Sequence, residues 1–592
     1  MCGFLGLLTD SSLNVENLAS ANNYMTCRGP DSTKVLQDSN KLGNLYLSFN
    51  RLKIIDLSDD ANQPMFSNNQ KNTLMFNGEI YNHRELRKDL ISKGVTFKTD
   101  HSDSEVVLNG ISHYGIDYVK QLRGQFAISF INQTKSKLFL VVDRLGQKPL
   151  YYHIGNKEIG FSSNLQTLKK IFNTNINSQS LNEYLRYGVV SSPNTILEGI
   201  FKLEPSTILE IDLTNKSIIN KRKFWELENF VDNKKFSNDE FFSNFDEAVA
   251  IRSVADVPVA NFLSGGIDST SIIKNMIQQE INVNSFSVHL DNEKYDESNW
   301  SNQVSSFYNT NHSSITISTD LNVDEVNLAL ECLDEPYADP SVVPSFFLSK
   351  EISKKYKVAI SGDGGDELLG GYERIQNSIS KNSIYDNFLS KFYFIYPNIL
   401  GTGNYFLSKS NNLNQAYSSY FEDDKFLNLL GINKNEINKN INLISGLENY
   451  KALLVQDYKY YLPEMMMFKV DRTSMQNSLE VRSPFVDHKL VEYVLSTKSN
   501  ESLNMNKNVL RKYLLNDFTD EFVYRKKAGF IFDLEGWVSK NSDFVFETLH
   551  YGKINDYLNL KKINLLTLRK SRMNANRIWK LYVLENYLTR AA

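Results

Sequence analysis

Cysteine is scarce in this sequence. The chain has three cysteines, Cys2, Cys27 and Cys332, which are too few and too widely spaced for a disulfide framework or a thiolate metal site. Disulfide frameworks are typical of small proteins in oxidising compartments. A reducing compartment is therefore expected, and we predict a cytoplasmic protein.

A surplus of basic residues is also absent. Lys and Arg number 65 against 69 Asp and Glu, so the formal net charge at pH 7 is −4. A nucleic-acid partner requires a basic face or stripe that neutralises phosphates. The composition therefore predicts no nucleic-acid partner.

Long apolar segments are missing as well. The longest aromatic-apolar stretch, Phe392–Leu400, is short and contains a proline, and no basic segment followed by an apolar run opens the chain. A helix that spans a bilayer needs about 20 apolar residues. The sequence therefore predicts neither a signal peptide nor a membrane span, and no membrane partner.

The length of 592 residues predicts two domains and a helical extension, because single cores stop growing beyond about 300 residues. Residues 1–213 contain short apolar or alternating segments separated by turn residues, namely Asn44–Phe49, Thr73–Phe76, Gln125–Ile131 and Lys137–Val142. This pattern is typical of strands in an antiparallel, β-rich domain with a few helices.

The pattern changes at Asp239, where predicted strands and helices begin to alternate. Strands are predicted over 257–263, 283–290 and 358–361, and helices over 269–279 and 297–308. Such alternation predicts a parallel sheet with crossover helices. The polar, lysine-rich segment 214–238 is interpreted as a linker between a domain over 1–213 and a domain over 239–592. Residues 378–449, rich in Asn, Ser and Lys, are predicted to form irregular helices.

Cys2 follows the initiator methionine, whose removal would leave a thiol and a free α-amine on one residue. An α-amino group titrates near pH 8, so at neutral pH part of it is unprotonated and can accept the thiol proton. This pattern predicts a nucleophile that carries its own base. A chance cysteine in a disordered start is the competing interpretation.

Other polar residues of the first domain fit a thiol amidohydrolase. The Asn77 side-chain amide and the Gly78 N–H, at the end of a predicted strand, can converge on the oxyanion of a tetrahedral intermediate. Arg51 can bind an α-carboxylate and Asp103 an α-ammonium, the two charged ends of an amino acid. The alternatives are a hairpin turn at Asn77-Gly78 and solvated surface charges at Arg51 and Asp103.

A glycine-rich loop follows the predicted strand 257–263 and leads into a helix, with the sequence Ser264-Gly265-Gly266-Ile267-Asp268-Ser269. Backbone N–H groups at a helix N-terminus bind anions, and the loop lacks the lysine of a Walker loop. It therefore predicts a pyrophosphate site, with a structural turn as the alternative. A second acidic loop, Ser361–Glu367, also follows a strand, and its carboxylates together with Asp268 are suited to Mg²⁺.

In combination, these residues resemble the glutamine-hydrolysing asparagine synthetases along nearly the whole chain. The matching motifs occur in the family's order: Met1-Cys2-Gly3, Arg28-Gly29-Pro30-Asp31, Arg51-Leu52, Asn77–Asn82, Asp143-Arg144, Lys148–Tyr152, Leu263–Ser269, Asp334-Glu335-Pro336, Asp339-Pro340-Ser341, Ser361–Glu367, Gly370-Gly371-Tyr372, Val470-Asp471-Arg472 and Leu479–Phe485. The resemblance implies an α+β N-terminal-nucleophile glutaminase, an αββα sandwich, followed by an α/β parallel-sheet ATP-pyrophosphatase domain with a helical extension. It also implies a homodimer.

The same resemblance implies roles for individual residues. Cys2 is the implied nucleophile, with Asn77 and Gly78 as the oxyanion donors, and glutamine binding is assigned to Arg51, Leu52, Asn77, Gly78, Glu79 and Asp103. ATP binding is assigned to Leu263, Ser264, Gly265, Gly266, Asp268, Ser269, Val288, Ser361 and Gly362. Formation of the acyl-adenylate is assigned to Asp363 and Arg472, and binding of Mg²⁺ to Asp268 and Asp366.

The sequence departs from the family pattern beside both expected sites. Cys27 replaces the histidine of His-Arg-Gly-Pro-Asp, and Phe49-Asn50 lies within the segment that is commonly Gly-His-x-Arg-Leu, so the rate of glutamine turnover is affected more than its chemistry. Asp363 is one methylene shorter than the glutamate of many aspartate-specific members. In this respect the loop resembles a branch whose members include enzymes that amidate other carboxylates.

Three functions are consistent with these features. The leading one is glutamine-dependent conversion of aspartate to asparagine with release of AMP and pyrophosphate. The second is the same chemistry on another carboxylate, such as a uronic acid for a surface polysaccharide. The third is a non-catalytic scaffold or a bare glutaminase. Free ammonia is mostly protonated at neutral pH, so the first two functions require a dry passage between the domains.

Overall fold

The computed structural model describes residues 2–291, 296–318, 320–379, 388–433, 441–500, 505–526, 532–568 and 571–590. Its first part contains two six-stranded antiparallel sheets, ordered β10-β8-β9-β1-β3-β2 and β12-β11-β7-β6-β5-β4. Their strands are β1 (Gly3–Thr9), β2 (Ser32–Asn40), β3 (Gly43–Arg51), β4 (Met65–Phe66), β5 (Asn72–Ile80), β6 (Gly124–Asn132), β7 (Lys137–Val142), β8 (Tyr151–Ile154), β9 (Glu158–Ser162), β10 (Phe201–Lys202), β11 (Thr207–Asp212) and β12 (Ser217–Lys223).

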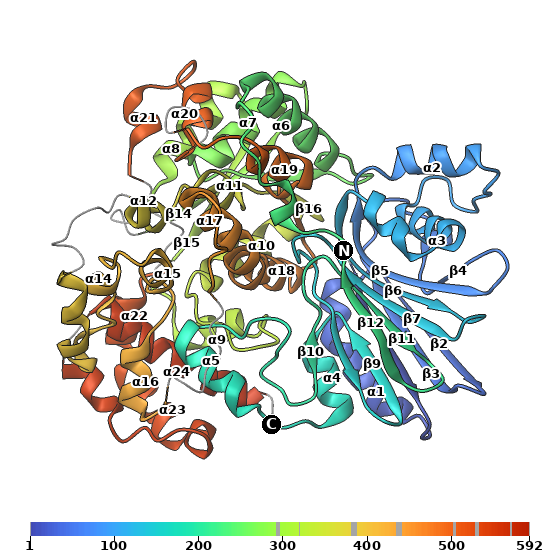
Figure 1. Cartoon of the computed structure of the whole chain (residues 1–592), viewed down its shortest axis with the longest axis horizontal. Helices are drawn as coiled ribbons and strands as arrows, with labels where there is room; N and C mark the ends of the chain where they lie inside the picture. Colours follow the sequence, from blue (N-terminus) through green and yellow to red (C-terminus); the bar gives the residue numbers. More distant parts are fainter. Residues whose placement is uncertain are drawn as a thin grey trace.

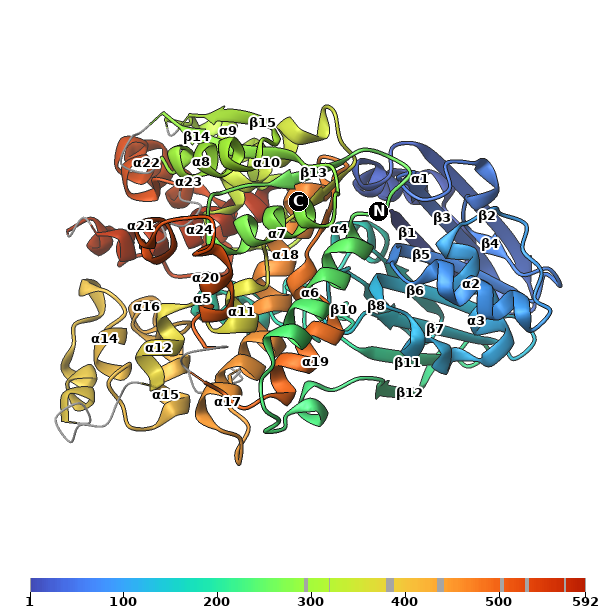
Figure 2. The ribbon, with the colours of Figure 1, turned by 90° about the horizontal axis from the view of Figure 1, so that it is seen from above.

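The two sheets stack face to face and are covered by helices on their outer sides (Figure 2). In β1, Phe4 and Leu8 pack between the sheets, whereas Leu5 and Leu7 pack outward under helices α1 (Val15–Asn22) and α4 (Leu165–Phe172). Successive strand residues face opposite sides, so a strand buried on both sides is apolar throughout. Helices α2 (His83–Ser92) and α3 (Asp103–Tyr114) cover the other sheet. The predicted αββα sandwich is confirmed.

The segment predicted as a linker contains a strand. Strand β12 lies within 214–238 and pairs with β11, so the sheet continues to Lys223. Six of the seven residues of β12 are exposed, as expected for a polar edge strand that has no apolar alternation. After it, Trp225 and Leu227 already pack into the core of the second domain.

The second domain contains a five-stranded parallel sheet in the order β15-β14-β13-β16-β17, as the alternating pattern predicted. Its strands are β13 (Val259–Phe262), β14 (Asn284–Leu290), β15 (Asn311–Ile317), β16 (Val358–Ile360) and β17 (Glu480–Arg482). The helices around it include α6 (Asn238–Arg252), α7 (Ile267–Gln278), α8 (Ser298–Tyr308), α9 (Val323–Leu330), α10 (Val342–Ser353), α11 (Gly365–Leu369), α12 (Glu373–Ile379), α17 (Asn449–Gln456), α18 (Phe468–Met475), α19 (His488–Ser496), α20 (Asn508–Leu514) and α21 (Asp520–Tyr524).

A helical lobe completes the molecule at the side remote from the two antiparallel sheets (Figure 1). The segment predicted as irregular helices contributes short elements, η5 (Lys391–Ile395), η6 (Asn398–Leu400), α14 (Asn404–Leu407), α15 (Leu413–Ser418) and α16 (Asp424–Leu430), while its residues 380–387 and 434–440 lie outside the described part. The C-terminal helices α22 (Leu534–Lys540), α23 (Ser542–Tyr551) and α24 (Arg572–Arg590) pack beside them. A search of the described residues finds no helix with the length and hydropathy of a bilayer-spanning segment.

Buried ion pairs join the two domains. Arg28 donates two hydrogen bonds to the Asp471 carboxylate, at 2.8 and 3.0 Å. Arg123 donates two to Asp487, both at 2.9 Å, and Arg252 adds a third at 2.8 Å. Bidentate arginine–carboxylate pairs are strong and geometrically specific, so these contacts fix how the domains sit against each other.

Candidate active sites

Cys2 lies immediately before β1 and is buried. Its backbone nitrogen, which removal of Met1 would turn into the α-amine, donates to Asn77 Oδ1 at 3.0 Å. The Cys2 carbonyl accepts a hydrogen bond from Arg28 Nε at 3.2 Å. Burial raises the pKa of the Cys2 thiol, against the opposing effects of nearby positive charge and of a hydrogen bond from the Leu52 backbone. Cys2 therefore belongs to an ordered, packed site, and the interpretation as a disordered start is wrong.

Asn77 and Gly78 lie inside β5, paired with Ala127 and Phe126 of β6, so neither the predicted strand end nor the hairpin alternative is correct. Gly78 has φ +155, and a Cβ there would meet the Gln125 carbonyl oxygen at 2.0 Å, which only glycine avoids. The Asn77 Nδ2 donor is buried and has no hydrogen-bond partner in the described chain. An amide N–H held next to Cys2 in this way is suited to receive an oxyanion.

Arg51 and Asp103 are both about 5% exposed, so the interpretation as solvated surface charges is wrong. The Arg51 guanidinium donates to the Ser58 carbonyl at 2.6 Å and to Asn62 Oδ1 at 2.9 Å, and it also contacts the Asp56 carbonyl. These hydrogen bonds hold the loop that follows β3 in place. Asp103 begins α3 and accepts a hydrogen bond from the Ile80 N–H at 3.1 Å, and burial raises its pKa. Their roles as glutamine ligands stay predictions.

Glu79 connects this site to the second domain. Its carboxylate lies 3.2 Å from the Arg482 guanidinium, which also pairs with Glu480 at 2.6 Å. Burial raises the pKa of Glu79, whereas positive charge lowers that of Glu480. Because Glu79 is engaged across the interface, its first role here is to hold β5 against β17.

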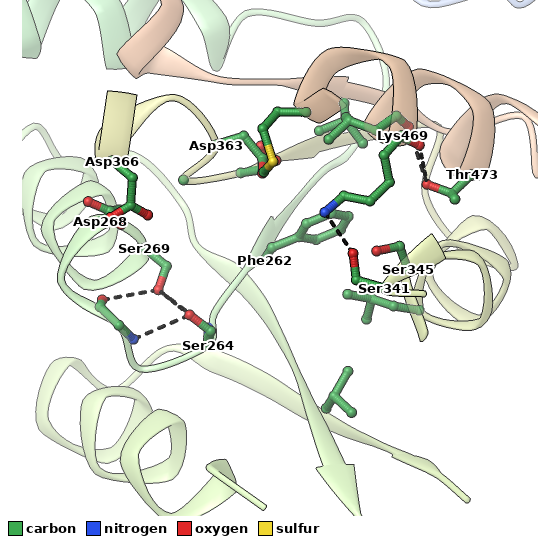
Figure 3. A pocket seen from close by; sticks show the side chains of 18 of the residues that line it. Phe262, Ser264, Asp268, Ser269, Ser341, Ser345, Asp363, Asp366, Lys469 and Thr473 are labelled. Atoms are coloured by element: carbon green, nitrogen blue, oxygen red, sulfur yellow. Dashed lines mark hydrogen bonds between the residues drawn. The ribbon is translucent and has the colours of Figure 1, made fainter. Parts of the chain in front are cut away.

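The second site is a cavity of about 660 Å³ at the carboxyl ends of β13, β14 and β16 (Figure 3). This is the edge of a parallel sheet where ligands bind. Of the residues predicted to bind ATP, eight line the cavity: Leu263, Ser264, Gly266, Asp268, Ser269, Val288, Ser361 and Gly362. Phe262 and Phe286 add aromatic surface. The predicted loops therefore meet at one place.

The loop Ser264–Ser269 has the geometry of an anion-binding loop. Ser264 Oγ lies 3.2 Å from Ser269 Oγ and accepts a hydrogen bond from the Gly266 N–H at 3.3 Å (Figure 3). Gly265 shapes the loop with φ +69, because a Cβ there would meet the Ser301 backbone nitrogen at 2.7 Å. The N-terminus of α7, at Ile267, follows directly, so backbone N–H groups face the cavity edge where anions are favoured.

Asp268 and Asp366 come together at the cavity wall, where Lys507 Nζ lies 2.6 Å from Asp268 and 2.5 Å from Asp366. One ammonium thus already bridges both carboxylates, so this position accepts a cation. Among the described residues no group of three or more His, Cys, Asp or Glu side chains gathers at one point. Two carboxylates with further ligands from phosphate and water are the pattern that Mg²⁺ favours, so the pair fits Mg²⁺.

Asp363 and Glu367 lie in the same acidic loop. Asp363 lines the cavity, and its carbonyl accepts a hydrogen bond from Ser483. Glu367 is fully buried and accepts a hydrogen bond from Tyr372 Oη at 2.8 Å. Burial and the nearby Asp366 and Asp457 raise the pKa of Glu367 to about 8. The loop therefore presents the Asp363 side chain to the cavity and keeps the buried Glu367 carboxyl mostly protonated at neutral pH.

Arg472 lies outside the cavity, contrary to the prediction that places it near the phosphates. Its guanidinium donates to Asp334 at 2.9 Å and to Tyr151 Oη at 2.5 Å, at the domain interface. Lys469, one helical turn earlier in α18, points into the cavity instead and donates to Ser341 Oγ at 3.0 Å (Figure 3). Lys469 directly precedes the motif Val470-Asp471-Arg472, and helix geometry decides which of the two cations faces the cavity.

A small cavity of about 10 Å³, roughly the room of one water molecule, lies at the domain interface beside the large cavity. The first domain contributes Gln125, Gln147 and Lys148, and Gln125 is paired with Glu79 across β5 and β6. Ser361, Val470, Ser474 and Val481 line both this cavity and the larger one. Gln125 Nε2, Ser361 Oγ and Ser474 Oγ are buried polar atoms with no hydrogen-bond partner in the described chain.

These features define the class of protein to which the chain belongs. The domain that holds a buried N-terminal cysteine beside an open amide donor packs against a parallel-sheet domain with a pyrophosphate-type loop. This is the architecture of a two-domain glutamine amidotransferase that activates its acceptor with nucleotide. The chain belongs to the asparagine synthase family, because the family model for asparagine synthase matches residues 240–589 and that for the glutamine amidotransferase domain matches residues 1–225. This family uses ATP as a substrate.

Relatives match at moderate identity. Glutamine-hydrolysing asparagine synthetase 1 of Bacillus subtilis (strain 168) is 28% identical, over 98% of this chain and 96% of its own length. Asparagine synthetase 3 of the same organism is 27% identical over 90% and 87%. A putative asparagine synthetase of Methanocaldococcus jannaschii is 31% identical over 63% and 76%. The family and its two domains follow from these matches, whereas the acceptor substrate does not.

Proposed function

We propose that this protein hydrolyses glutamine at Cys2 and transfers the ammonia to an ATP-activated carboxylate, converting aspartate to asparagine with release of AMP and pyrophosphate. The observation that supports the proposal is the small cavity at the domain interface, which adjoins the large cavity and has one wall on the sheet that carries Asn77. Cys2 contacts Asn77 on β5, the neighbouring β6 supplies Gln125 to the small cavity, and four residues of that cavity also line the large one.

In the first site, the Cys2 thiolate attacks the side-chain amide carbon of glutamine, with its α-amine as the base. The oxyanion that forms receives a hydrogen bond from Asn77 Nδ2, the buried donor that has no partner in the described chain. Ammonia leaves with a proton from the α-ammonium, and a thioester remains. Water then attacks the thioester, which releases glutamate and restores the thiol.

Ammonia reaches the second site through the small cavity in this proposal. The Gln125, Ser361 and Ser474 side chains offer polar atoms along the way, and Val470 and Val481 supply apolar walls. Lys148 borders the same space, and burial lowers its pKa. A narrow route of this kind, shielded from bulk water, favours neutral ammonia, because the ammonium ion is costly to desolvate.

In the second site, a carboxylate oxygen of the acceptor attacks the α-phosphorus of ATP and pyrophosphate leaves. The N–H groups of Ser264–Ser269, together with the Lys469 ammonium group, stabilise the charge of the departing group. Asp268 and Asp366 would hold Mg²⁺, which neutralises phosphate charge when bound. Ammonia then attacks the acyl carbon, AMP leaves with the acyl oxygen, and the amide forms.

Another carboxylate, such as a uronic acid, is the second candidate acceptor. Asp363 supports it, because a shorter carboxylate leaves more room in the cavity than the glutamate of many aspartate-specific members. Arg572 and Asn576 support it too, because they occupy one face of α24 at spacing i, i+4 and add polar groups to the cavity wall. A scaffold or bare glutaminase has less support, because Cys2 and the loop Ser264–Ser269 are both intact.

The deciding experiment uses glutamine labelled with ¹⁵N in its side-chain amide, with ATP, Mg²⁺ and either L-aspartate or a panel of uronic acids. Mass spectrometry locates the label while pyrophosphate release is followed in parallel. Label in asparagine is the expected result. Label in a uronamide, with aspartate unchanged, would assign the second acceptor. Glutamine loss without pyrophosphate, whatever acceptor is present, would leave only the bare glutaminase.

A further inference from the structure

The helical lobe carries an exposed apolar surface that the proposed chemistry does not use. We call it the aromatic face, and it consists of Phe388, Phe392, Phe394, Ile395, Tyr405 and Met573. Phe394 and Ile395 are 78% and 75% exposed, and Tyr405 is 65% exposed. Large apolar side chains gathered on a surface mark an interaction site, whereas single ones are common. Figures 1 and 2 place α14, which contains Tyr405, at the end of the molecule remote from the antiparallel sheets.

The aromatic face is held by the residues beneath it. Tyr393, between two exposed phenylalanines, is buried, and Lys425 Nζ lies 4.5 Å from the centre of its ring. Helix α24 holds η6, the short helix after the exposed phenylalanines. Arg577 of α24 donates to the Asn398 carbonyl at 2.7 Å, and Asn574 donates to the Ile399 carbonyl at 3.3 Å. Phe392 and Phe394 therefore point outward from an anchored segment.

The segment that carries most of the aromatic face has charged residues of one sign. Residues 388–421 contain two lysines, Lys391 and Lys409, and no Asp or Glu. The acidic residues of α16 and of the turn before it are already paired, since Asp423 binds Arg577 at 2.7 Å, and Glu422 and Asp424 bind Arg186. The exposed side chains are thus apolar rings and chains flanked by lysine.

This combination favours an anionic lipid surface over a second copy of the chain. In a twofold-symmetric dimer the same patch meets itself, so the lysines of this face would meet a surface of the same charge. Aromatic side chains flanked by lysine are instead typical of membrane interfaces, where the rings enter the headgroup region and the ammonium groups attract anionic lipids.

We propose that the aromatic face attaches the protein to anionic membrane surfaces. The attachment is peripheral, consistent with the finding that no described helix is suited to span a bilayer. Met573 belongs to this face, and its neighbour Arg572 lines the cavity, so attachment brings the rim of the second site close to the lipid headgroups.

The test is co-sedimentation of the full-length protein with vesicles of phosphatidylcholine, alone or mixed with phosphatidylglycerol. We expect pelleting with the mixed vesicles only. Phe394→Ser/Ile395→Ser should lower the affinity by about a hundredfold, because two inserted side chains are lost. Lys391→Glu should lower it by about tenfold or more. The matched control, Ile218→Ser/Ile219→Ser, changes two exposed isoleucines on β12 and should bind as the unmodified protein does.

Three outcomes would overturn the proposal: no pelleting with either vesicle, equal pelleting with neutral vesicles, or equal loss in the β12 control. A dimer that the Phe394→Ser/Ile395→Ser variant abolishes, without vesicle binding, would assign the face to a second copy instead. Glutamine-dependent amidation of a soluble acceptor is measured alongside and should be unchanged in every variant. Failure of vesicle binding is thereby distinguished from failure of the proposed function.

Discussion

At the scale of single residues, Cys2 and its contact with Asn77 separate the two half-reactions. Cys2→Ala removes the nucleophile but no group of the large cavity, so glutamine-dependent amidation should fall by about 10⁴-fold or more. Amidation with added ammonium salt should continue at the unmodified rate. Both activities are followed by pyrophosphate release.

Cys27 provides the matched control. It is a half-buried cysteine whose Sγ lies 3.4 Å from Gln476 Oε1 at the domain interface. Cys27→Ala should retain glutamine-dependent amidation within about tenfold. Loss of the ammonia-dependent activity in Cys2→Ala, with the Cys27 variant active, would refute the assignment of separate sites.

Glu367 makes stability depend on pH. Its pKa is about 8 in the folded protein, against a reference value of 4.5. Between these values the folded chain keeps a proton that the unfolded chain has lost, so the free energy of unfolding falls as pH rises, by up to about 1.4 kcal/mol per pH unit. Glu367→Gln should remove this component of the slope, as measured by urea unfolding at pH 5 to 8. Parallel curves for both proteins would contradict the assignment.

At the scale of elements, the strand–loop–helix unit around Ser264–Ser269 carries the phosphate chemistry. Asp268→Asn removes one of the two carboxylates that Lys507 bridges. We expect pyrophosphate release to fall by about 10²-fold or more while glutaminase activity survives, because the two sites lie in different domains. Unchanged pyrophosphate release, measured with saturating ammonia, would show that the loop is misassigned.

Helix α18 presents one face to the large cavity and another to the interface between the domains. Lys469→Met should lower ammonia-dependent amidation by about 10²-fold without lowering stability, because Lys469 faces the cavity. Arg472→Met is the matched substitution on the interface face, and there the main expected effect is a loss of about 3 kcal/mol of stability, since it leaves Asp334 unpaired and buried. Equal kinetic defects in the two variants at equal stability would contradict this division.

The comparison of sequence with structure is most informative at this scale. Strands β3, β5, β6 and β7 and the parallel order around β13 were predictable, because buried strands are apolar and loops after them are rich in glycine. Strand β12 was not, since an exposed edge has no apolar alternation. The motif around Val470-Asp471-Arg472 indicates a cation near the cavity but does not indicate that Lys469, rather than Arg472, lines it. Lys507 has no signal in the sequence, because its contact with Asp268 spans 239 residues of chain.

At the scale of the whole molecule, the pair of Arg28 and Asp471 joins both sites. Arg28 also donates to the Cys2 carbonyl, so the same guanidinium contacts the nucleophile and α18. Asp471→Asn should cost about 3–5 kcal/mol of stability, because a buried charge loses its partner. It should also raise the ratio of glutamate to pyrophosphate above one, since the domains lose a fixed alignment.

The matched control is Asp117→Asn, which breaks an exposed pair with Arg222 on the surface of the first domain. Exposed pairs contribute about 0–1 kcal/mol, so this variant should unfold and turn over as the unmodified protein does. Urea unfolding and product ratios are measured for both. A glutamate-to-pyrophosphate ratio of one in Asp471→Asn would show that the pair is structural only.

The shared guanidinium also has a consequence for biosynthesis. Arg28 is translated long before Asp471, so a ribosome-bound chain has a folded sandwich whose nucleophile is not yet supported from the other side. The support arrives only when α18 has formed and docked. If the proposed function holds, the alignment of the two sites is therefore complete only in the finished chain, and glutamine hydrolysis by an unfinished chain would not be coupled to amidation.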